Sequence, residues 1–424
     1  MRLMQNSGIE WIGEIPKEWT INSISQLFSQ VKNKNTDLQE TNLLSLSYGK
    51  IKRKNIETTD GLLPESFDGY NIVESNDIVL RLTDLQNDHK SLRVGLVTER
   101  GIITSAYLTI RNHSESIAKY LYFYLHAFDI SKGFYGMGAG VRQGLNWDGI
   151  KWLKMLSPSI PEQQAIADFL DSQCVHIDSV IEKTRAAIEE YKRLKQSVIT
   201  QAVTKGIRPN REMKDSGIEW IGEIPREWSI VKIKHLGEYR NGLTYNPTDV
   251  VNKNDGVLVL RSSNIQHGKL CLLDNVYVNM TIPEQLMVKK GDIVICSRNG
   301  SRALIGKCAV VEESLVASFG AFMMSYRCKS SKYMYYILNS EVFKYHLNTF
   351  LTSTINQLTG GNFGNMSIVW CRNKNEQSEI VAYLDEKTAA IDSLIQKKEQ
   401  LITELEAYKK SLIYEYVTGK KEVE

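Results

Sequence analysis

The feature that most constrains this 424-residue chain is an internal repeat. The segment Ser7–Trp19 returns as Ser216–Trp228, and the two 13-residue copies differ only in Lys17 against Arg226. Self-similarity at a fixed long period is the signature of a duplicated architecture. The chain is therefore expected to fold as two related halves rather than as one large domain.

The similarity between the halves continues downstream with varying strength. Residues 162–204 align without gaps on residues 376–418, and the shorter motifs Asp77-Ile-Val and Asp292-Ile-Val recur between the ends. In the same alignment Gly95 is matched with Gly306. Each half thus has a near-identical opening, a variable middle and a long shared ending.

The two endings are expected to be long helices, because neither proline nor glycine occurs in 162–205 or in 376–418. Apolar residues recur there at alternating steps of three and four, a heptad stripe that two helices bury by packing as a coiled coil. Lys195 and Lys409 interrupt the stripe at equivalent positions. The stripe residues are Leu170, Ile177, Ile181, Ile188, Tyr191, Val198, Leu384, Ile391, Ile395, Ile402, Leu405 and Leu412. Packing of each helix on its own domain remains the alternative.

The variable middles have the pattern of α+β domains. Short apolar runs predict strands, among them 77–82, 94–97, 104–110, 292–296, 308–311 and 317–326. One amphipathic helix is predicted in each half, at 119–128 and at 332–343. The predicted fold class is α+β, a tandem duplication with domains at 1–158 and 207–372. They are separated by long helices at 159–206 and 373–424, which form an antiparallel, pseudo-two-fold symmetric coiled coil.

Composition excludes several classes of protein. Lys and Arg number 52 against 49 Asp and Glu, which neither demands nor forbids a nucleic-acid partner, because a binding groove needs local positive charge. The longest strongly apolar run, 314–326, is shorter than the roughly 20 residues that cross a bilayer. The N-terminus lacks a signal-peptide core, so a cytoplasmic protein without a membrane partner is expected. The six cysteines show no zinc-ligand spacing, and no metal site is predicted.

A search for catalytic motifs is negative. The chain has no phosphate-binding G-x-x-x-x-G-K-[ST] loop, no dinucleotide fingerprint between a strand and a helix, and no Asn-Pro-Pro-aromatic methyltransferase signature. None of the seven histidines belongs to a nucleophile motif. The sequence therefore predicts a protein without an active site of its own.

The polar loops of both middles suit DNA contacts, because Arg or Lys pairs with guanine and Asn or Gln with adenine in the major groove. In the first half the candidates are Tyr48, Lys50, Lys52, Arg53, Lys54, Arg81, Thr83, Gln86, Arg142 and Gln143. In the second half they are Arg261, Ser262, Ser263, Asn264, His267, Arg298, Asn299, Ser301, Arg302, Thr354, Asn356 and Gln357. Any single one of these residues is more often a solvated surface residue, so the hypothesis depends on their clustering at matching places.

Together these features resemble the DNA-specificity subunit of a type I restriction–modification system. The resemblance spans essentially the whole chain and is carried by the repeated opening, the two Asp-Ile-Val strands and the helix openings Pro-Glu-Gln-Gln-Ala-Ile at 161–166 and Asn-Glu-Gln-Ser-Glu-Ile at 375–380. The second helix opening lacks the proline of the first.

The resemblance implies that each middle is a target-recognition domain for one half of an asymmetric, gapped site on double-stranded DNA. The helices would set the gap and dock two methyltransferase subunits, which would bring S-adenosylmethionine and the active site for a flipped adenine. Two translocase–nuclease subunits that use ATP and Mg would be able to join for restriction. This chain would be non-catalytic and would bind no cofactor itself.

Two other hypotheses remain open. A coiled-coil adaptor with protein-binding end domains explains the duplication and the helices equally well, but not the matching Arg, Asn and Gln loops. A self-sufficient DNA-modifying enzyme lacks the necessary cofactor and catalytic motifs. A steep loss of DNA affinity with salt would separate a DNA-binding protein from the adaptor.

Overall fold

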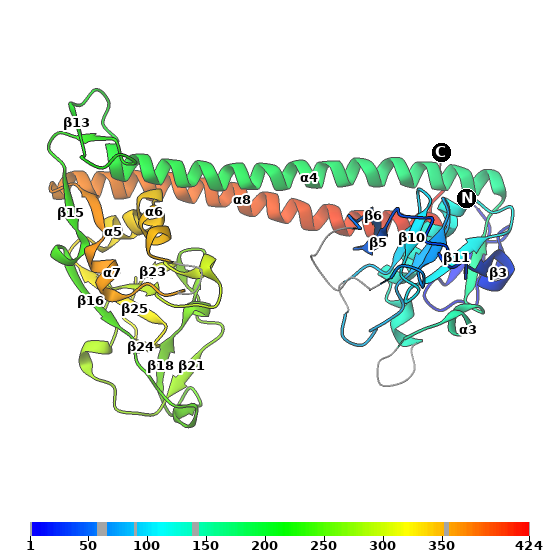
Figure 1. Cartoon of the computed structure of the whole chain (residues 1–424), viewed down its shortest axis with the longest axis horizontal. Helices are drawn as coiled ribbons and strands as arrows, with labels where there is room; N and C mark the ends of the chain where they lie inside the picture. The colour runs from blue at the N-terminus through cyan, green and yellow to red at the C-terminus, as the bar shows by residue number, and fades with distance from the viewer. Residues whose placement is uncertain (1, 57–65, 89–90, 138–143, 352–355, 424) are drawn as a thin grey trace. The chain divides into compact units, whose positions relative to one another are not determined.

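The computed structural model describes residues 2–56, 66–88, 91–137, 144–351 and 356–423. It divides into two compact units, each made of one globular region and a part of both long helices (Figure 1). The first unit is Met1–Thr184 with Gln400–Glu424, and the second is Arg185–Glu399. No helix among the described residues is both long enough and apolar enough to cross a membrane.

The two long helices are α4 (Ile160–Lys205) and α8 (Lys374–Val417). In the first unit Ile177 and Ile181, from the early part of α4, share a core with Leu412 near the end of α8. In the second unit Ile199, near the end of α4, shares a core with Leu384 from the early part of α8. The helices are therefore antiparallel within each unit, and the predicted coiled coil is confirmed.

The predicted stripe is the buried face of these helices. Its buried members are Leu170, Ile177, Ile181, Ile188, Leu384, Ile391, Ile395 and Leu412, and its half-buried members are Tyr191, Val198, Ile402 and Leu405. Near the helix ends the buried face extends to the following residue, Ile199 on α4 and Ile413 on α8. A straight helix has 3.6 residues per turn, so its buried face drifts away from a strict seven-residue repeat.

The two lysines that interrupt the stripe pair with aspartates across the helices. Lys195 Nζ lies 2.7 Å from the Asp392 carboxylate in the second unit, and Lys409 Nζ lies 2.7 Å from Asp178 Oδ1 in the first. Both lysines and both aspartates are equivalent in the repeat, since each pair is offset by 214 residues (409 − 195 and 392 − 178). The same interhelical ion pair is thus made once in each unit.

The first globular region is built on a four-stranded antiparallel sheet in the order β4-β11-β8-β9, with α2 packed against it. These elements are β4 (Phe28–Gln30), β8 (Ile78–Leu80), β9 (Val94–Leu96), β11 (Leu108–Asn112) and α2 (Ala118–Ile130). Two-stranded pairs are β1 (Met4–Asn6) with β2 (Glu14–Pro16), β3 (Thr20–Ser23) with β12 (Lys154–Ser157), β5 (Leu44–Ser47) with β6 (Lys50–Arg53), and β7 (Asn71–Val73) with β10 (Gly101–Ile103). The short helices are α1 (Ile24–Leu27), η1 (Gly133–Gly136) and α3 (Trp147–Ile150).

The second globular region repeats this sheet in the order β16-β25-β22-β23. Its strands are β16 (Gly237–Asn241), β22 (Ile293–Cys296), β23 (Cys308–Val310) and β25 (Met323–Cys328). A further sheet of four strands consists of β17 (Val250–Val251), β21 (Val276–Val278), β18 (Val257–Leu260) and β24 (Ala317–Phe319). The two-stranded pairs are β13 (Met213–Asp215) with β14 (Glu223–Pro225), β15 (Ser229–Lys232) with β26 (Ser367–Trp370), and β19 (Ile265–Gln266) with β20 (Lys269–Leu270). The helices are α5 (Ser331–Leu338), α6 (Glu341–Phe350), α7 (Gly360–Asn365), η2 (Ile233–His235), η3 (Pro247–Asp249), η4 (Ser262–Asn264), η5 (Glu284–Leu286) and η6 (Arg302–Leu304).

Two predicted elements of the second half are each split in the structure. The helix expected at 332–343 ends at Leu338 and restarts at Glu341, because Ser340 has an extended backbone at the N-cap position of the second helix and its side chain bonds back to the Ile337 carbonyl. The strand expected at 317–326 breaks after Phe319 at a turn, so that β24 and β25 join different sheets. Glycine at Gly320 suits such a break.

The expected match of Gly95 with Gly306 is wrong. Gly95 lies in β9 opposite Val79, and the residue in the same place in β23 is Ala309, opposite Val294. A Cβ at Gly95 would meet the Leu46 side chain at 2.5 Å, so this glycine makes room for close packing. Gly306 instead precedes β23 with a φ of +84°, which favours glycine.

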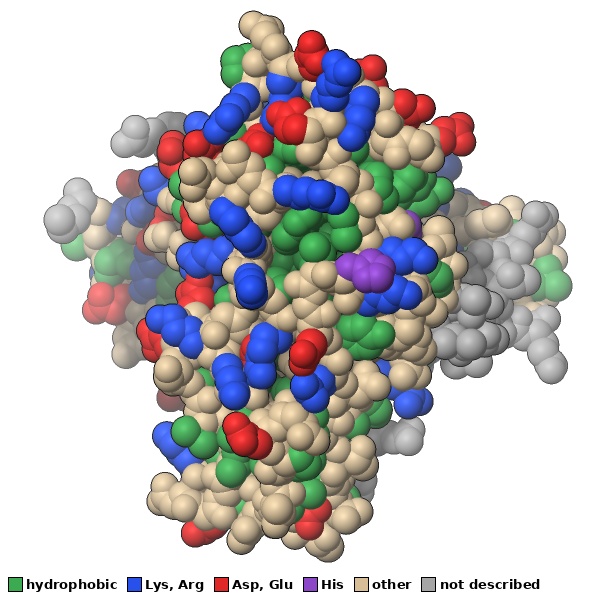
Figure 2. Space-filling model, turned by 90° about the vertical axis from the view of Figure 1, so that its left-hand side faces the viewer, with side chains coloured by type: hydrophobic (Ala, Val, Ile, Leu, Met, Phe, Trp, Pro, Cys, Tyr) green, Lys and Arg blue, Asp and Glu red, His purple; other side chains and the backbone are tan. Residues whose placement is uncertain are grey.

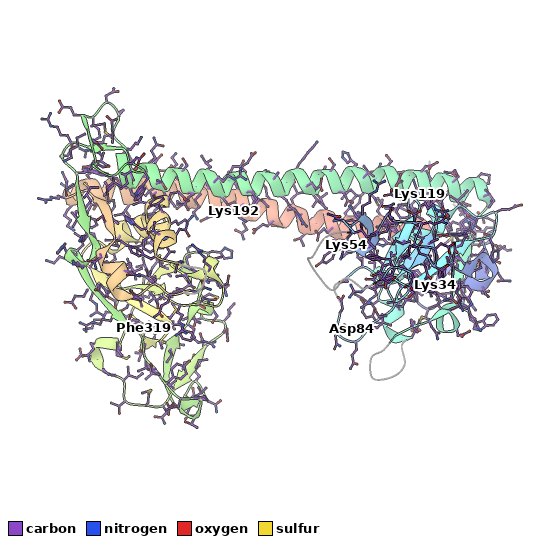
Figure 3. The ribbon with its side chains drawn as sticks, viewed as in Figure 1. Lys34, Lys54, Asp84, Lys119, Lys192 and Phe319 are labelled. Carbon is purple, nitrogen blue, oxygen red and sulfur yellow. The ribbon has the colours of Figure 1, made fainter. Side chains whose placement is uncertain are left out.

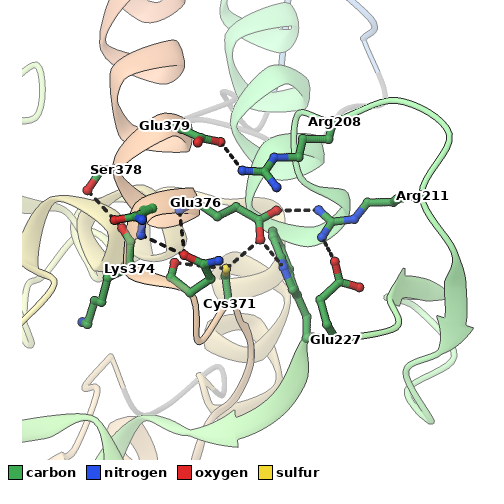
Figure 4. Close-up of polar contacts among 11 residues, drawn as sticks. Arg208, Arg211, Glu227, Cys371, Lys374, Glu376, Ser378 and Glu379 are labelled. Atoms are coloured by element: carbon green, nitrogen blue, oxygen red, sulfur yellow. Dashed lines mark hydrogen bonds and ion pairs between the residues drawn. The ribbon is translucent and has the colours of Figure 1, made fainter.

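The repeated opening segment ties each globular region to the start of a long helix. Trp19 Nε1 donates to Glu162 of α4 at 3.0 Å, and Trp228 Nε1 donates to Glu376 of α8 at 3.2 Å. Arg211 also donates to Glu376, at 2.6 Å, as Figure 4 shows. Burial works against ionisation of Glu376, but hydrogen bonds from Arg211, Cys371 and Trp228 hold its pKa below the ordinary value. The near-identity of the two openings is thereby explained by identical anchoring contacts.

Candidate nucleic-acid interface

One connection between sheet strands carries candidate residues in both units. It follows β8 in the first unit (residues 81–93) and β22 in the second (residues 297–307), and we call these connections the recognition loops. They occupy equivalent places because β8 pairs with β9 as β22 pairs with β23. In Figure 3, Asp84 of the first recognition loop lies on the side of the first unit away from the helices. Lys119 lies beside α4 and forms an ion pair with Asp171, 2.9 Å away.

In the first recognition loop the candidate side chains are partly exposed. Thr83 and Gln86 are exposed, and Arg81 is half-buried with Nη2 3.5 Å from an oxygen of Asp88. The loop is thus oriented with polar side chains outward. The candidates Arg142 and Gln143 lie outside the described residues.

The hairpin β5–β6 presents the other candidates of the first unit. Its turn is Tyr48-Gly49, with positive φ at both residues, and the Tyr48 side chain is 74% exposed. Lys50 Nζ lies 3.1 Å from Asp178 of α4, and Arg53 binds the Glu99 carboxylate, so both cations have partners inside the unit. Lys52 and Lys54 are exposed.

In the second unit the turn that follows β18 is held by one asparagine. Asn264 is fully buried, and its Oδ1 accepts the backbone N–H of Arg261. Its Nδ2 donates to the carbonyls of Cys271 and Asp274 and to Asn275 Oδ1. Asn264 therefore supports the turn and does not present an amide edge to a base, contrary to the expectation from its sequence.

The neighbours of Asn264 differ in accessibility. Arg261 pairs with Asp274 at 2.9 Å, and Ser263 is half-buried. His267 is exposed at the turn of the hairpin β19–β20, where His267-Gly268 repeats the positive φ pair of Tyr48-Gly49. The two hairpins thus end in the same kind of turn but expose different side chains.

The second recognition loop brings together candidates from three segments. Arg298 and Gln357 face each other in an antiparallel β-bridge, and Asn299 Nδ2 donates to Ser262 Oγ at 3.1 Å. The Asn299 side chain also accepts the backbone N–H of Ser301. Two further candidates contact neighbouring segments: Asn356 donates to the Gly300 carbonyl at 3.5 Å and Arg302 to Asn348 at 3.4 Å. Thr354 lies outside the described residues.

Sequence reasoning missed Phe322, which belongs to this cluster. Phe322 is 58% exposed, the Arg298 guanidinium carbon lies 5.2 Å from the centroid of its ring, and the Arg298 backbone N–H donates to the Phe322 carbonyl. The residue was hidden inside a run that predicted one continuous strand. An exposed aromatic ring beneath an arginine is a contact that favours a fixed guanidinium plane.

Arg298 also differs from three other candidate arginines, Arg53, Arg81 and Arg261, in its charge environment. Among the described residues it has no carboxylate partner, whereas Arg53, Arg81 and Arg261 each have one. A guanidinium already paired with a carboxylate must lose that partner before it binds a base edge or a phosphate. Arg298 is thus the better-placed donor of these four.

Local positive charge is present despite the small net charge. On the face shown in Figure 2, Lys and Arg side chains lie across the middle, while Asp and Glu are more frequent toward the top. Such uneven distribution is what phosphate contacts require. Among the described residues no cluster of three or more His, Cys, Asp or Glu side chains is arranged to hold a metal ion.

Comparison with known proteins shows which proteins this chain is similar to. Residues 225–404 match the family of the Type I restriction modification DNA specificity domain. Over 421 residues the chain is 24% identical to the type I restriction enzyme MjaVIII specificity subunit of Methanocaldococcus jannaschii, covering 96% of this chain and 93% of that one. It is 27% identical over 206 residues to the EcoKI specificity subunit of Escherichia coli K12, covering 47% and 44% of the two chains.

The fold has a solved counterpart. A chain from a structural study of complex assembly and conformational transition of the type I R-M system superposes with a TM-score of 0.71 at 14% identity, covering 96% of this chain and 99% of that one. The chain is therefore similar over almost its whole length to DNA-specificity subunits of type I restriction–modification systems, and the fold class and the general role predicted from the sequence are confirmed. Subunits of this family are generally non-catalytic.

Proposed function

We propose that the chain reads a bipartite, gapped DNA site, with residues 1–158 and 207–372 each acting as the target-recognition domain for one half. The observation that carries this proposal is the pair of recognition loops, which occupy equivalent places in two related sheets but carry different side chains. Equivalent placement suits a shared task, and different chemistry gives different half-sites. The long helical segments 159–206 and 373–424 set the unread gap by their length.

The partners follow from this role. Double-stranded DNA binds the recognition loops, and two methyltransferase subunits dock on the helices and carry S-adenosylmethionine and the catalytic site for a flipped adenine. Two restriction–translocation subunits with ATP and Mg complete the complex for cleavage. The chain itself supplies no catalytic group, and it acts in the cytoplasm on the cell's own and incoming DNA.

The test of this function is single-molecule sequencing of host DNA for N6-methyladenine, with and without the gene. A bipartite, gapped methylation motif that disappears on deletion supports the proposal and gives both half-sites. An unchanged methylome in cells that express the partner subunits would reject it in favour of a protein-binding adaptor. In that case the purified complex would also lack the steep salt dependence of DNA binding.

Modularity is tested by Gln357→Ala. Removal of an amide that faces Arg298 across the bridge is expected to relax recognition in one half-site and leave the other unchanged. Gln285→Ala, an exposed glutamine of the same unit outside the recognition loop, is the matched control and should preserve both half-sites. Loss of recognition at both halves in Gln357→Ala would contradict modular reading.

A further inference from the structure

A buried arginine lies at the centre of the first recognition loop. Arg93 directly precedes β9, and its side chain is fully buried. A guanidinium carries five N–H donors in a fixed plane, and the structure provides five acceptors. These acceptors are the Tyr135 hydroxyl at 3.0 Å from Nε, the carbonyls of Arg81 (3.0 Å) and Thr83 (2.8 Å) from Nη1, and those of Asp84 (3.2 Å) and Asp88 (2.5 Å) from Nη2.

The first recognition loop depends on Arg93 because four of the five acceptors are backbone carbonyls of the loop itself. Burial of a charged group is costly unless its hydrogen bonds are satisfied. Among the described residues the Arg93 guanidinium has no ion pair with a carboxylate side chain. The nearby Asp129 carboxylate accepts the backbone N–H of Arg93 at 2.6 Å. Four loop carbonyls and the Tyr135 hydroxyl therefore satisfy the N–H groups of the guanidinium, and the carbonyls do so only while the loop keeps this conformation.

The same contacts determine which side chains face outward. Leu82 and Leu85 are each 1% exposed and point into the core, whereas Thr83 and Gln86 are exposed. Asp84 adopts a left-handed φ of 55°, a conformation that costs energy in a residue with a Cβ and needs support from its surroundings. The carbonyls bound by Arg93 provide that support at the place where the loop turns.

The second unit uses the equivalent position for a similar purpose. Lys307 directly precedes β23 as Arg93 directly precedes β9. The Lys307 carbonyl accepts the backbone N–H of Cys296 at 2.8 Å, and the Arg93 carbonyl accepts the backbone N–H of Arg81 at 2.9 Å. Lys307 Nζ donates to the Ser262 carbonyl at 3.0 Å. A cation at this position thus bonds to backbone carbonyls in both units, to one carbonyl in the second unit (in the turn after β18) and to four in the first (in the recognition loop).

We propose that Arg93 is the positioning residue of the first target-recognition domain: it fixes the backbone of residues 81–88 and thereby determines which bases the first half-site contains. This inference rests on the proposed function. Arg93 does not itself contact DNA, because its side chain is inaccessible.

The test uses the complete complex with its methyltransferase subunits and duplexes that carry single base-pair substitutions in either half-site. The first half-site is the one that Gln357→Ala leaves unchanged. Arg93→Met should lower discrimination in the first half by about ten-fold or more, as expected when a base contact is lost, and leave the second half unchanged. Arg93→Lys, with its charge but fewer donors, should restore part of the discrimination. Lys307→Met, the matched variant, should affect only the second half.

Two results would overturn the inference: unchanged discrimination in Arg93→Met, or an equal loss in both halves. Should Arg93→Met fail to fold, Tyr135→Phe removes one contact to Arg93 and one to the Asp88 carbonyl without exposing a charge. It should then relax the first half alone and speed hydrogen exchange at residues 81–88, and the absence of both effects would reject the inference. Absence of any bipartite motif with the wild-type complex would instead reject the proposed function.

Discussion

The two units build the same sheet and differ in what holds the loop that follows its buried strand. In the first unit a single buried arginine, Arg93, donates hydrogen bonds to the backbone carbonyls of the loop. In the second unit the loop is held by a β-bridge to Gln357, by Asn299 bonded to Ser262, and by the backbone of Phe322. A sheet that is constant therefore does not dictate how its loop is ordered, which leaves the loop free to vary in length and chemistry.

The shared frame, by contrast, repeats its contacts residue for residue. Arg111 donates to Asp77 at 2.7 Å in the first sheet, and Arg327 donates to Asp292 at 2.6 Å in the second. These aspartates belong to the two Asp-Ile-Val motifs, so the motif combines a buried strand with a partner for a fixed arginine. In the shared sheets and helices, the two units should therefore differ in how deeply equivalent side chains are buried. In the recognition loops, they should differ in which side chains are present.

The largest expected effect concerns the anchoring glutamates. Glu376 and Arg211 have side chains only 3% and 11% exposed, so Glu376→Ala leaves the buried Arg211 cation with the 58% exposed Glu227 as its carboxylate partner and should cost about 3 kcal/mol of unfolding free energy. Glu162→Ala should cost about 1 kcal/mol, because the side chains of Glu162 and Arg2 are each 21% exposed. Urea unfolding measures both variants. Equal losses would contradict the difference in burial.

A second effect distinguishes the units by pH. His126 is buried on α2 and stacks on Tyr122, and burial lowers its pKa to about 4. The unfolded chain binds this proton near pH 6.5, so the first unit should lose stability as the pH falls from 6.5 toward 4, by about 3 kcal/mol. At the equivalent place α5 is followed by Asn339, which does not titrate.

His126→Phe should remove this slope. The measurement is hydrogen exchange in α2 and α5 of the intact chain at pH 7.5 and pH 4.5, which reports the two units separately. In the variant the difference between the two pH values should shrink in α2 and stay the same in α5. A slope in α2 that persists after the substitution would assign the acid sensitivity to another group.

The third comparison is between arginines of the second unit. Arg298→Ala should weaken DNA binding by the assembled complex by about ten-fold, whereas Arg261→Ala should have a smaller effect because Arg261 is already paired with Asp274. Electrophoretic mobility shifts with the cognate duplex at fixed salt measure both. A larger loss in Arg261→Ala would show that the Asp274 pair opens on binding.

The smallest effect concerns the interhelical lysines. Lys409→Ala should lower the free energy of unfolding by about 0.5–1 kcal/mol, because its partner Asp178 is two-thirds buried. The loss stays small because Asp178 keeps its ion pair with Lys50. Lys195→Ala should cost less, since Asp392 is 54% exposed. Thermal unfolding at low and high salt checks both values, and a loss that does not fall with added salt would argue against an electrostatic origin.

Much of the fold was predictable, because the duplication, the helix lengths and the apolar stripe can be recognised from local sequence and its periodicity. The helix break at Ser340 and the strand break at Gly320 were missed, since each is a short interruption within an otherwise regular apolar pattern. Placement of the loops between strands was predicted in outline. The bounds of the recognition domains and their base contacts stay predictions.

The supporting contacts within the loops were not predictable for a different physical reason. The acceptors around Arg93 are backbone carbonyls, which every residue has, so no pattern of residue types distinguishes this arginine from one on the surface. Asn264 illustrates the reverse, because an amide suited to adenine is equally suited to closing a turn. Phe322 was concealed because exposure depends on where a strand ends.

The reciprocal ion pairs have a consequence for how the helices change in length. The paired residues are separated by the same number of positions on both helices, 195 − 178 = 17 on α4 and 409 − 392 = 17 on α8. An insertion between the two paired positions on one helix alone would shift one of its paired residues along the axis. One Lys–Asp contact would then be lost when the other is kept. Viable length variants are thus expected to arise as paired events, with a gain on α4 compensated by an equal gain on α8.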